Sequence, residues 1–115
     1  MIEWMNIKTT DQYEELIRES FKKPLIIFKH SRSCGFSAMA LRKFEKDFHT
    51  TNEINLTMVN VRVDRKISNF IAEQHQITHE SPQLLFIKNG EVLYHASHSY
   101  INANEVLNHL SISDN

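Results

Sequence analysis

The sequence predicts an α/β domain with a central mixed β-sheet flanked by helices, in the order β-α-β-α-β-α-β-β-α. Segments with apolar residues at helical spacing alternate along the chain with short, β-branched apolar runs, which is the pattern of α/β proteins. Asn89-Gly90 separates two apolar runs, and this dipeptide is typical of a tight β-hairpin because both positions accept positive φ. The 115 residues contain no repeat, low-complexity tract or Pro/Gly-rich linker. We therefore expect a single domain over residues 1–115.

The N-terminal part of the chain is expected to form a strand, a helix and a second strand. Residues 2–7 alternate weakly and predict a short strand, whereas residues 9–21 have helical spacing. The N-cap candidates of this helix are Thr9, Thr10 and Asp11, and its apolar side is formed by Tyr13, Leu16, Ile17 and Phe21. Residues 25–30, LIIFKH, form a continuous apolar run that suits a buried central strand.

The middle of the chain predicts a helix over roughly residues 35–48, a strand within 54–64 and a third helix that starts near Ser68. The inward positions of the second helix are Met39 or Ala40, Phe44 and Phe48, with Leu41 beside them. The alternation in 54–64 is irregular, as a β-bulge would make it. The inward positions of the third helix are Ile67, Phe70, Ile71 and Ile77. The strands on either side of the second helix should be parallel, with a right-handed crossover.

The C-terminal part predicts a hairpin and a closing helix. Residues 79–83, HESPQ, are expected to form a loop before a hairpin over residues 84–96. Residues 102–110 have helical character, with Asn102 or Asn104 as the N-cap.

Charge and hydropathy exclude several classes of protein. The net charge of -1 and the pI of about 6.6 lack the basic excess of general nucleic-acid or membrane-surface binding. No apolar run approaches the roughly 20 residues that span a bilayer, and the N-terminus lacks the apolar region of a signal peptide. A single cysteine fits a reducing compartment. We therefore expect a cytoplasmic protein with neither a nucleic acid nor a membrane as partner.

Cys34, the only cysteine, lies between a polar loop and the expected start of the second helix. A reactive cysteine needs its thiolate form stabilised. A helix N-terminus contributes about 0.3–1 kcal/mol, less than one pKa unit, so cations must add to it. Lys29 and Arg32 precede the thiol, and no acidic residue occurs from position 24 to 43. The other interpretation is a buried structural cysteine, although its flanks are polar.

A lone thiol cannot cycle through an internal disulfide. Ser37 stands where the second cysteine of a C-x-x-C motif would stand, so exchange must involve an external small thiol. The Ser37 hydroxyl would either donate a hydrogen bond to the thiolate or cap the helix. Phe36 would either dock a protein partner or pack inward.

Two further elements have open interpretations. Pro82 either is an ordinary proline at a strand start or forms a cis bond beside the thiol. His79, His95 and His98 lack a carboxylate or a second cysteine that would complete a metal site, so we expect no metal and a solvated or groove-lining role.

Together these pieces resemble the thioredoxin superfamily over nearly the whole chain: the strand LIIFKH, a loop cysteine that opens a helix, and Ser-Pro before a hairpin and a last helix. The resemblance implies that Pro82 is cis and faces the catalytic thiol. Within the superfamily, IFKHSRSCGFSAMALRKFE, HESPQLLFIKNGEVLYHASH and the strand with Trp4 are most similar to the YtxJ-type monothiol bacilliredoxins.

That resemblance implies a monothiol oxidoreductase that removes bacillithiol, a low-molecular-weight thiol, from S-thiolated cytoplasmic proteins. Cys34 would be the nucleophile, and Ser81 and Pro82 would shape a groove for the small thiol. His79 or His98 would contact carboxylates of that thiol. We expect the protein to be a monomer.

One departure keeps other functions open. The family usually has Cys-Pro-Ile-Ser, whereas this chain has Cys34-Gly35-Phe36-Ser37. CGFS resembles the signature of monothiol glutaredoxins, which bind a [2Fe-2S] cluster in a dimer with glutathione. Gly35 would alternatively let a partner disulfide approach closely. An iron–sulfur carrier and a non-catalytic binding module of the same fold therefore remain as alternatives, although a non-catalytic module would not need Cys34.

Overall fold

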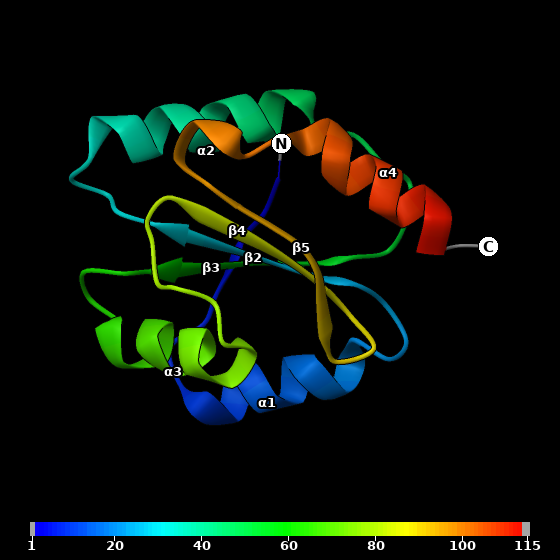
Figure 1. Cartoon of the computed structure of the whole chain (residues 1–115), viewed down its shortest axis with the longest axis horizontal. Helices are drawn as coiled ribbons and strands as arrows, with labels where there is room; N and C mark the ends of the chain where they lie inside the picture. The colour runs from blue at the N-terminus through cyan, green and yellow to red at the C-terminus, as the bar shows by residue number, and fades with distance from the viewer. Residues whose placement is uncertain (1, 114–115) are drawn as a thin grey trace.

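A computed structural model describes residues 2–113 as a five-stranded mixed sheet between two layers of helices (Figure 1). Its elements are β1 (Met5–Asn6), α1 (Thr10–Glu19), β2 (Leu25–His30), α2 (Gly35–Asp47), β3 (Asn55–Asn60), α3 (Arg65–His75), β4 (Gln83–Lys88), β5 (Glu91–Ser97), a 3-10 turn η1 (His98–Tyr100) and α4 (Ala103–Ser113). The strand order is β1-β3-β2-β4-β5, with β1, β3 and β2 parallel and β4 and β5 antiparallel to their neighbours. The expected order of elements and the parallel β2-α2-β3 unit are confirmed.

The central strand β2 is buried on both faces, which explains its continuous apolar run. Leu25 and Ile27 pack with α1 and α3 in one cluster, whereas Ile26 and Phe28 pack with α2 and α4 in the other. Figure 1 shows the same division, with α2 and α4 above the sheet and α1 and α3 below it.

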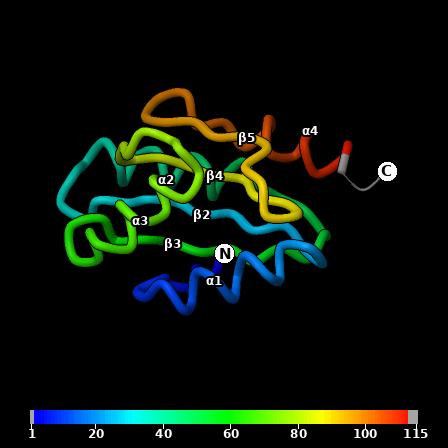
Figure 2. The backbone as a smooth tube through the Cα atoms, turned by 60° about the horizontal axis from the view of Figure 1, so that its bottom comes forward, coloured from blue at the N-terminus to red at the C-terminus, as the bar shows by residue number. Residues whose placement is uncertain are grey.

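Three connections meet at one end of the sheet. The antiparallel register pairs Lys29 with Gln83, so the loop that follows β2 lies at the same end as Ser81-Pro82, which enters β4. The parallel register pairs His30 with Asn60, which places the β3–α3 turn there too. Figures 1 and 2 both show these loops together at the left of the sheet. The carboxyl ends of β2 and β3 therefore converge on the entry to β4.

The turn and cap signals of the sequence are confirmed. Asn89 and Gly90 both have positive φ, 54° and 76°, and join β4 to β5. Thr9 is the N-cap of α1, in a capping box with Gln12. At α4, Asn102 Oδ1 accepts a hydrogen bond from the backbone N–H of Asn104 at 2.8 Å.

Some boundaries and faces differ from expectation. The helix α1 ends at Glu19, so Phe21 is 63% exposed and lies near the hairpin turn. Met39 is 61% exposed, and Ala40 faces the core in its place. The third helix begins at Arg65, and Val63 lies beyond the end of β3 and is 76% exposed. The irregular register lies in the β4–β5 pair, not in β3.

Candidate functional site

Cys34 is the N-cap residue of α2 and is partly exposed. Its backbone N–H donates to the Ser31 carbonyl at 3.2 Å, and its carbonyl accepts from Ala38 N at 3.1 Å. These bonds form a tight turn that leads into the helix. The thiol makes no capping hydrogen bond, and its residue stands at the N-terminus of α2, the positive end of the helix dipole.

Ser37 holds the loop that carries Cys34. Its hydroxyl is fully buried, accepts a hydrogen bond from Ser31 N at 3.1 Å and lies 2.7 Å from His30 Nδ1. The two expected roles, donor to the thiolate or helix cap, are therefore not the contacts that it makes. It ties the end of β2 to the loop. Burial, followed by the charge of Arg32, lowers the pKa of His30, which favours a neutral imidazole.

Lys29 does not lie beside the thiol. Side chains alternate along β2, so Lys29 shares the face of Leu25 and Ile27, under α3 and away from α2. It is fully buried, and its Nζ donates to the Ser68 carbonyl at 2.9 Å. Burial, and then the charge of Arg65, lowers the pKa of Lys29 to about 8. The expectation that its ammonium flanks the thiolate is wrong.

Two arginines lie in or contact the loop that carries Cys34. Arg32 is exposed within the loop, as expected. Arg62, from the turn after β3, donates a hydrogen bond from Nη1 to the hydroxyl of Ser33, the residue before Cys34. Arg62 is not among the site residues predicted from the sequence. The only signal for it was the parallel pairing of β2 and β3, which brings their carboxyl ends together.

The Ser81–Pro82 peptide bond is cis, as the thioredoxin resemblance implied. The Pro82 carbonyl accepts a hydrogen bond from His98 N at 2.9 Å, which fastens this segment to η1. The Ser81 hydroxyl is buried and has no hydrogen-bond partner among the described residues. Ser81 and Pro82 thus lie at the same end of the sheet as the Cys34 loop.

A groove beside the first turn of α2 continues the site. Phe36 is 48% exposed, and its ring centroid lies 6.4 Å from that of His98. The groove has a volume of about 190 Å³, and its other lining residues are Met39, Ala40, Lys43, Ser99 and Ile101. Beyond its chain neighbours and its own helix backbone, no atom lies within 4 Å of where a side chain at Gly35 would begin, so there is open space at this position. Phe36 and His98 therefore form one wall of a mostly apolar groove.

His79 lies apart from this groove. Its Nε2 is 2.7 Å from the Ser68 hydroxyl in α3, and burial, followed by the charge of Lys29, lowers its pKa. His98 is exposed in η1, with Nδ1 at 3.9 Å from a carboxylate oxygen of Glu80. Of the two histidines expected near the small thiol, only His98 faces the groove.

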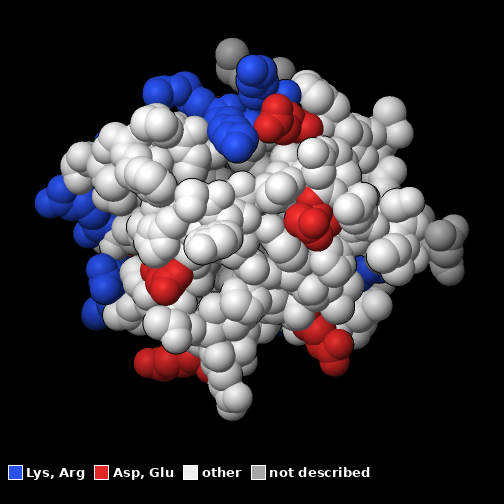
Figure 3. Space-filling model, turned by 45° about the horizontal axis from the view of Figure 1, so that its top comes forward, with Lys and Arg blue, Asp and Glu red and all other residues white. Residues whose placement is uncertain are grey.

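The exposed side of α2 carries charges of both signs, since Asp47 is exposed as well as three cations. The exposed cations of this helix are Arg42, Lys43 and Lys46. Figure 3 shows Lys and Arg side chains gathered at the upper and left margins of this face, with acidic side chains scattered singly.

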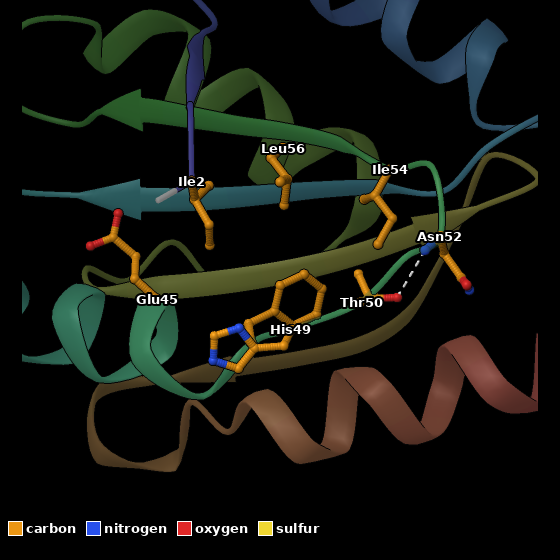
Figure 4. A pocket seen from close by; sticks show the side chains of 8 residues that line it. Ile2, Glu45, His49, Thr50, Asn52, Ile54 and Leu56 are labelled. Atoms are coloured by element: carbon orange, nitrogen blue, oxygen red, sulfur yellow. Dashed lines mark hydrogen bonds between the residues drawn. The ribbon is translucent and has the colours of Figure 1, made fainter.

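A second hollow lies at the far end of α2 (Figure 4). Its lining residues are Ile2, Glu45, Phe48, His49, Thr50, Asn52, Ile54 and Leu56. Glu45 accepts a hydrogen bond from Trp4 Nε1 at 2.8 Å. The hollow contains no thiol and lies three turns from Cys34, so it is separate from the candidate site.

Within residues 2–113, no group of three or more His, Cys, Asp or Glu side chains is arranged to hold a metal ion. Over the same residues, no helix has the length and apolar character that crossing a bilayer requires.

Comparisons with known proteins agree with this geometry. The sequence matches the family model described as monothiol bacilliredoxin BrxC over residues 5–106. A solved structure described by its thioredoxin fold and a suggested oxidoreductase role is 29% identical, with 90% of each chain covered and a TM-score of 0.75.

Two thioredoxins show the fold alone. That of Malassezia sympodialis is 18% identical, covering 96% of this chain and 90% of its own, with a TM-score of 0.70. Thioredoxin f of spinach chloroplast is 10% identical, covering 98% of this chain and 88% of its own, with a TM-score of 0.71. Because the family model covers most of the sequence, the chain belongs to the monothiol bacilliredoxin BrxC family and is a thioredoxin-fold protein with a thiol redox function.

Proposed function

We propose that this protein is a monothiol thiol-disulfide oxidoreductase that removes bacillithiol from protein mixed disulfides in the cytoplasm, acting as a monomer. One observation carries the proposal: Cys34, which bears the single thiol, is the N-cap residue of α2, at the end of the sheet where the cis Ser81–Pro82 bond enters β4. Family membership supports a low-molecular-weight thiol as co-substrate.

The reaction is two successive thiol-disulfide exchanges. The Cys34 thiolate attacks the bacillithiol sulfur of the mixed disulfide. The sulfur–sulfur bond to the substrate protein breaks, and the substrate leaves as a thiolate that takes up a proton. A second bacillithiol thiolate then attacks the disulfide on Cys34, which releases oxidised bacillithiol and regenerates the Cys34 thiolate.

Backbone groups and side chains around Cys34 would stabilise the thiolate and bind the substrate in these steps. The first-turn N–H groups of α2 and the charge of Arg32 stabilise the thiolate. Arg62 and Ser37 fix the loop through Ser33 and Ser31. Backbone groups of Ser81 and Pro82 would receive the extended disulfide. The groove between Phe36 and His98 would hold the remainder of the small thiol, with carboxylates near Arg32 and His98.

Intact-mass spectrometry tests the proposal. The protein is mixed with a substrate protein that carries bacillithiol in a mixed disulfide, in parallel with the same substrate carrying glutathione. We expect one bacillithiol mass on Cys34, gained faster than the glutathione mass, and none in Cys34→Ser. That variant should keep the circular dichroism spectrum of the parent. Transfer by folded Cys34→Ser would contradict the mechanism.

The CGFS tetrapeptide keeps an iron–sulfur carrier as a second candidate, because there is open space at Gly35, next to Cys34 in the chain, and thiolate is a good cluster ligand. Anaerobic reconstitution with iron, sulfide and either bacillithiol or glutathione tests it. Absence of transfer from both donors, together with a [2Fe-2S] absorption spectrum that requires Cys34, would favour the carrier. Absence of both would leave a non-catalytic module.

A further inference from the structure

Lys29 is a fully buried ammonium without an acidic partner. Its Nζ donates to the Ser68 carbonyl at 2.9 Å, and no carboxylate among residues 2–113 forms an ion pair with it. The neighbouring charged or titratable groups are Arg65 and His75 of α3 and His79 of the following loop. Burial of an unpaired charge is costly, so stability does not explain this lysine.

The contacts of Ser68 connect Lys29 to the loop before β4. The carbonyl of Ser68 accepts from Lys29, and its hydroxyl lies 2.7 Å from His79 Nε2. One residue of α3 therefore joins the central strand to the 77–82 segment, which ends at the cis Ser81–Pro82 bond.

A second set of contacts reaches the same segment. Gln83 is the cross-strand partner of Lys29, so the two side chains lie on one face of the sheet. The Gln83 side chain is buried and donates from Nε2 to the Thr78 carbonyl at 3.0 Å and to the Ser97 hydroxyl at 3.2 Å. Its Oε1 has no partner among the described residues. Ser68 and Gln83, the two residues next to Lys29, thus contact the 77–82 segment at His79 and at Thr78, respectively.

We propose that Lys29 is a positioning residue whose buried ammonium, through Ser68 and His79, fixes the 77–82 segment and with it the Ser81–Pro82 backbone that receives the mixed disulfide. Lys29 acts on the far side of the sheet from the thiol and does not stabilise the thiolate. This inference rests on the proposed thiol exchange.

The test compares Lys29→Met, which keeps an unbranched stem, with Lys22→Met, which removes an exposed lysine elsewhere. In Lys29→Met we expect amide hydrogen exchange over 77–82 to be at least about tenfold faster because the segment opens locally. We expect kcat/KM for transfer from a bacillithiolated protein to fall about tenfold, mainly through KM. Thermal stability should not fall, because an unpaired buried charge has been removed. Lys22→Met should match the parent.

Alkylation of Cys34 by iodoacetamide, followed against pH, separates positioning from action on the thiolate. We expect the same curve for Lys29→Met and the parent. A curve displaced to higher pH would show that Lys29 stabilises the thiolate and would overturn the proposal. Unchanged hydrogen exchange over 77–82 in folded Lys29→Met would overturn it as well.

A further measurement needs no variant. Burial lowers the pKa of Lys29 to about 8, so the backbone carbonyl ¹³C shifts of residues 77–82 in the parent should titrate with a midpoint near that value. Shifts that stay constant while the Cε resonance of Lys29 itself titrates would contradict the proposal even if Lys29→Met failed to fold. If the parent transferred no small thiol, the proposed function would be wrong. The alkylation and titration experiments would still test the role of Lys29, because neither depends on transfer.

Discussion

At the scale of single residues, Ser37 shows how the site depends on contacts with the chain and not only with the thiol. Its hydroxyl joins Ser31 N and His30 Nδ1 in a buried position. Both partners would lose their hydrogen bond without it. The loop that presents Cys34 is therefore held from inside the protein.

Replacement of Ser37 by Ala should lower the free energy of unfolding by about 1–3 kcal/mol, because a buried N–H and a ring nitrogen lose their partner. Urea unfolding measures this. Ser99→Ala, at an exposed position, is the control and should stay within about 0.5 kcal/mol of the parent. An equally small effect for Ser37→Ala would contradict the role of Ser37.

The sequence indicated which residues to consider at the site but not where each side chain points. Cys34 is recognisable because polar flanks and a helix start are local signals. Lys29 and Arg32 look equivalent in the sequence, yet one faces α3 and the other is exposed. Arg62 reaches Ser33 only because β3 pairs with β2. Such contacts depend on the register of the sheet, which a single segment does not encode.

At the scale of elements, the start of α2 determines which residue can stand at position 35. Cys34 is the N-cap and Gly35 the first helical residue, a position where proline is favourable because its N–H has no intrahelical partner. The backbone of Cys34, with φ -102° and ψ 115°, lies in the extended region that a residue before proline requires. The helix therefore does not need glycine at this position.

Gly35→Pro should retain the parent stability or gain about 0.4–1 kcal/mol, because the unfolded chain loses freedom. Ala38→Pro is the matched control: it removes the hydrogen bond from Ala38 N to the Cys34 carbonyl and should cost about 3 kcal/mol. Thermal and urea unfolding measure both. If Gly35→Pro lost as much stability as the Ala38→Pro control, the first turn of α2 would not accept proline at position 35.

Most elements were predictable because their signals are short-range: helical spacing, the LIIFKH run and Asn89-Gly90. The residues at which these elements end were harder to predict. Phe21 continues the helical spacing of α1, yet the helix stops at Glu19. Val63 continues the alternation of β3, but the last pair with β2 is His30 with Asn60. In both cases tertiary contacts end the element before the apolar pattern does.

At the scale of the whole molecule, burial places several imidazoles in the two layers between helices and sheet. Burial is the main cause of the lowered pKa of His30, His75 and His79. His75 also hydrogen-bonds the Tyr13 hydroxyl, whose pKa burial raises to about 12. The native state thus favours neutral forms on both sides of the sheet.

Stability should fall as pH falls from about 7 to about 5. The unfolded chain binds protons at these histidines near their usual pKa of about 6.5, whereas the native state resists protonation, so acid favours unfolding. Urea unfolding at the two pH values measures the difference. His75→Gln, which can still bond Tyr13, should reduce it. Equal stability at both pH values would contradict this account.

The position of β2 has a consequence for synthesis of the chain. Its two neighbours are β3 and β4, and residues 83–88 leave the ribosome long after residues 25–30. Until then, this fully buried strand has a row of unpaired backbone N–H and C=O groups along one edge. A nascent chain that ended before Gln83 would present this edge to other chains. Completion of the β4–β5 hairpin therefore covers that edge of β2.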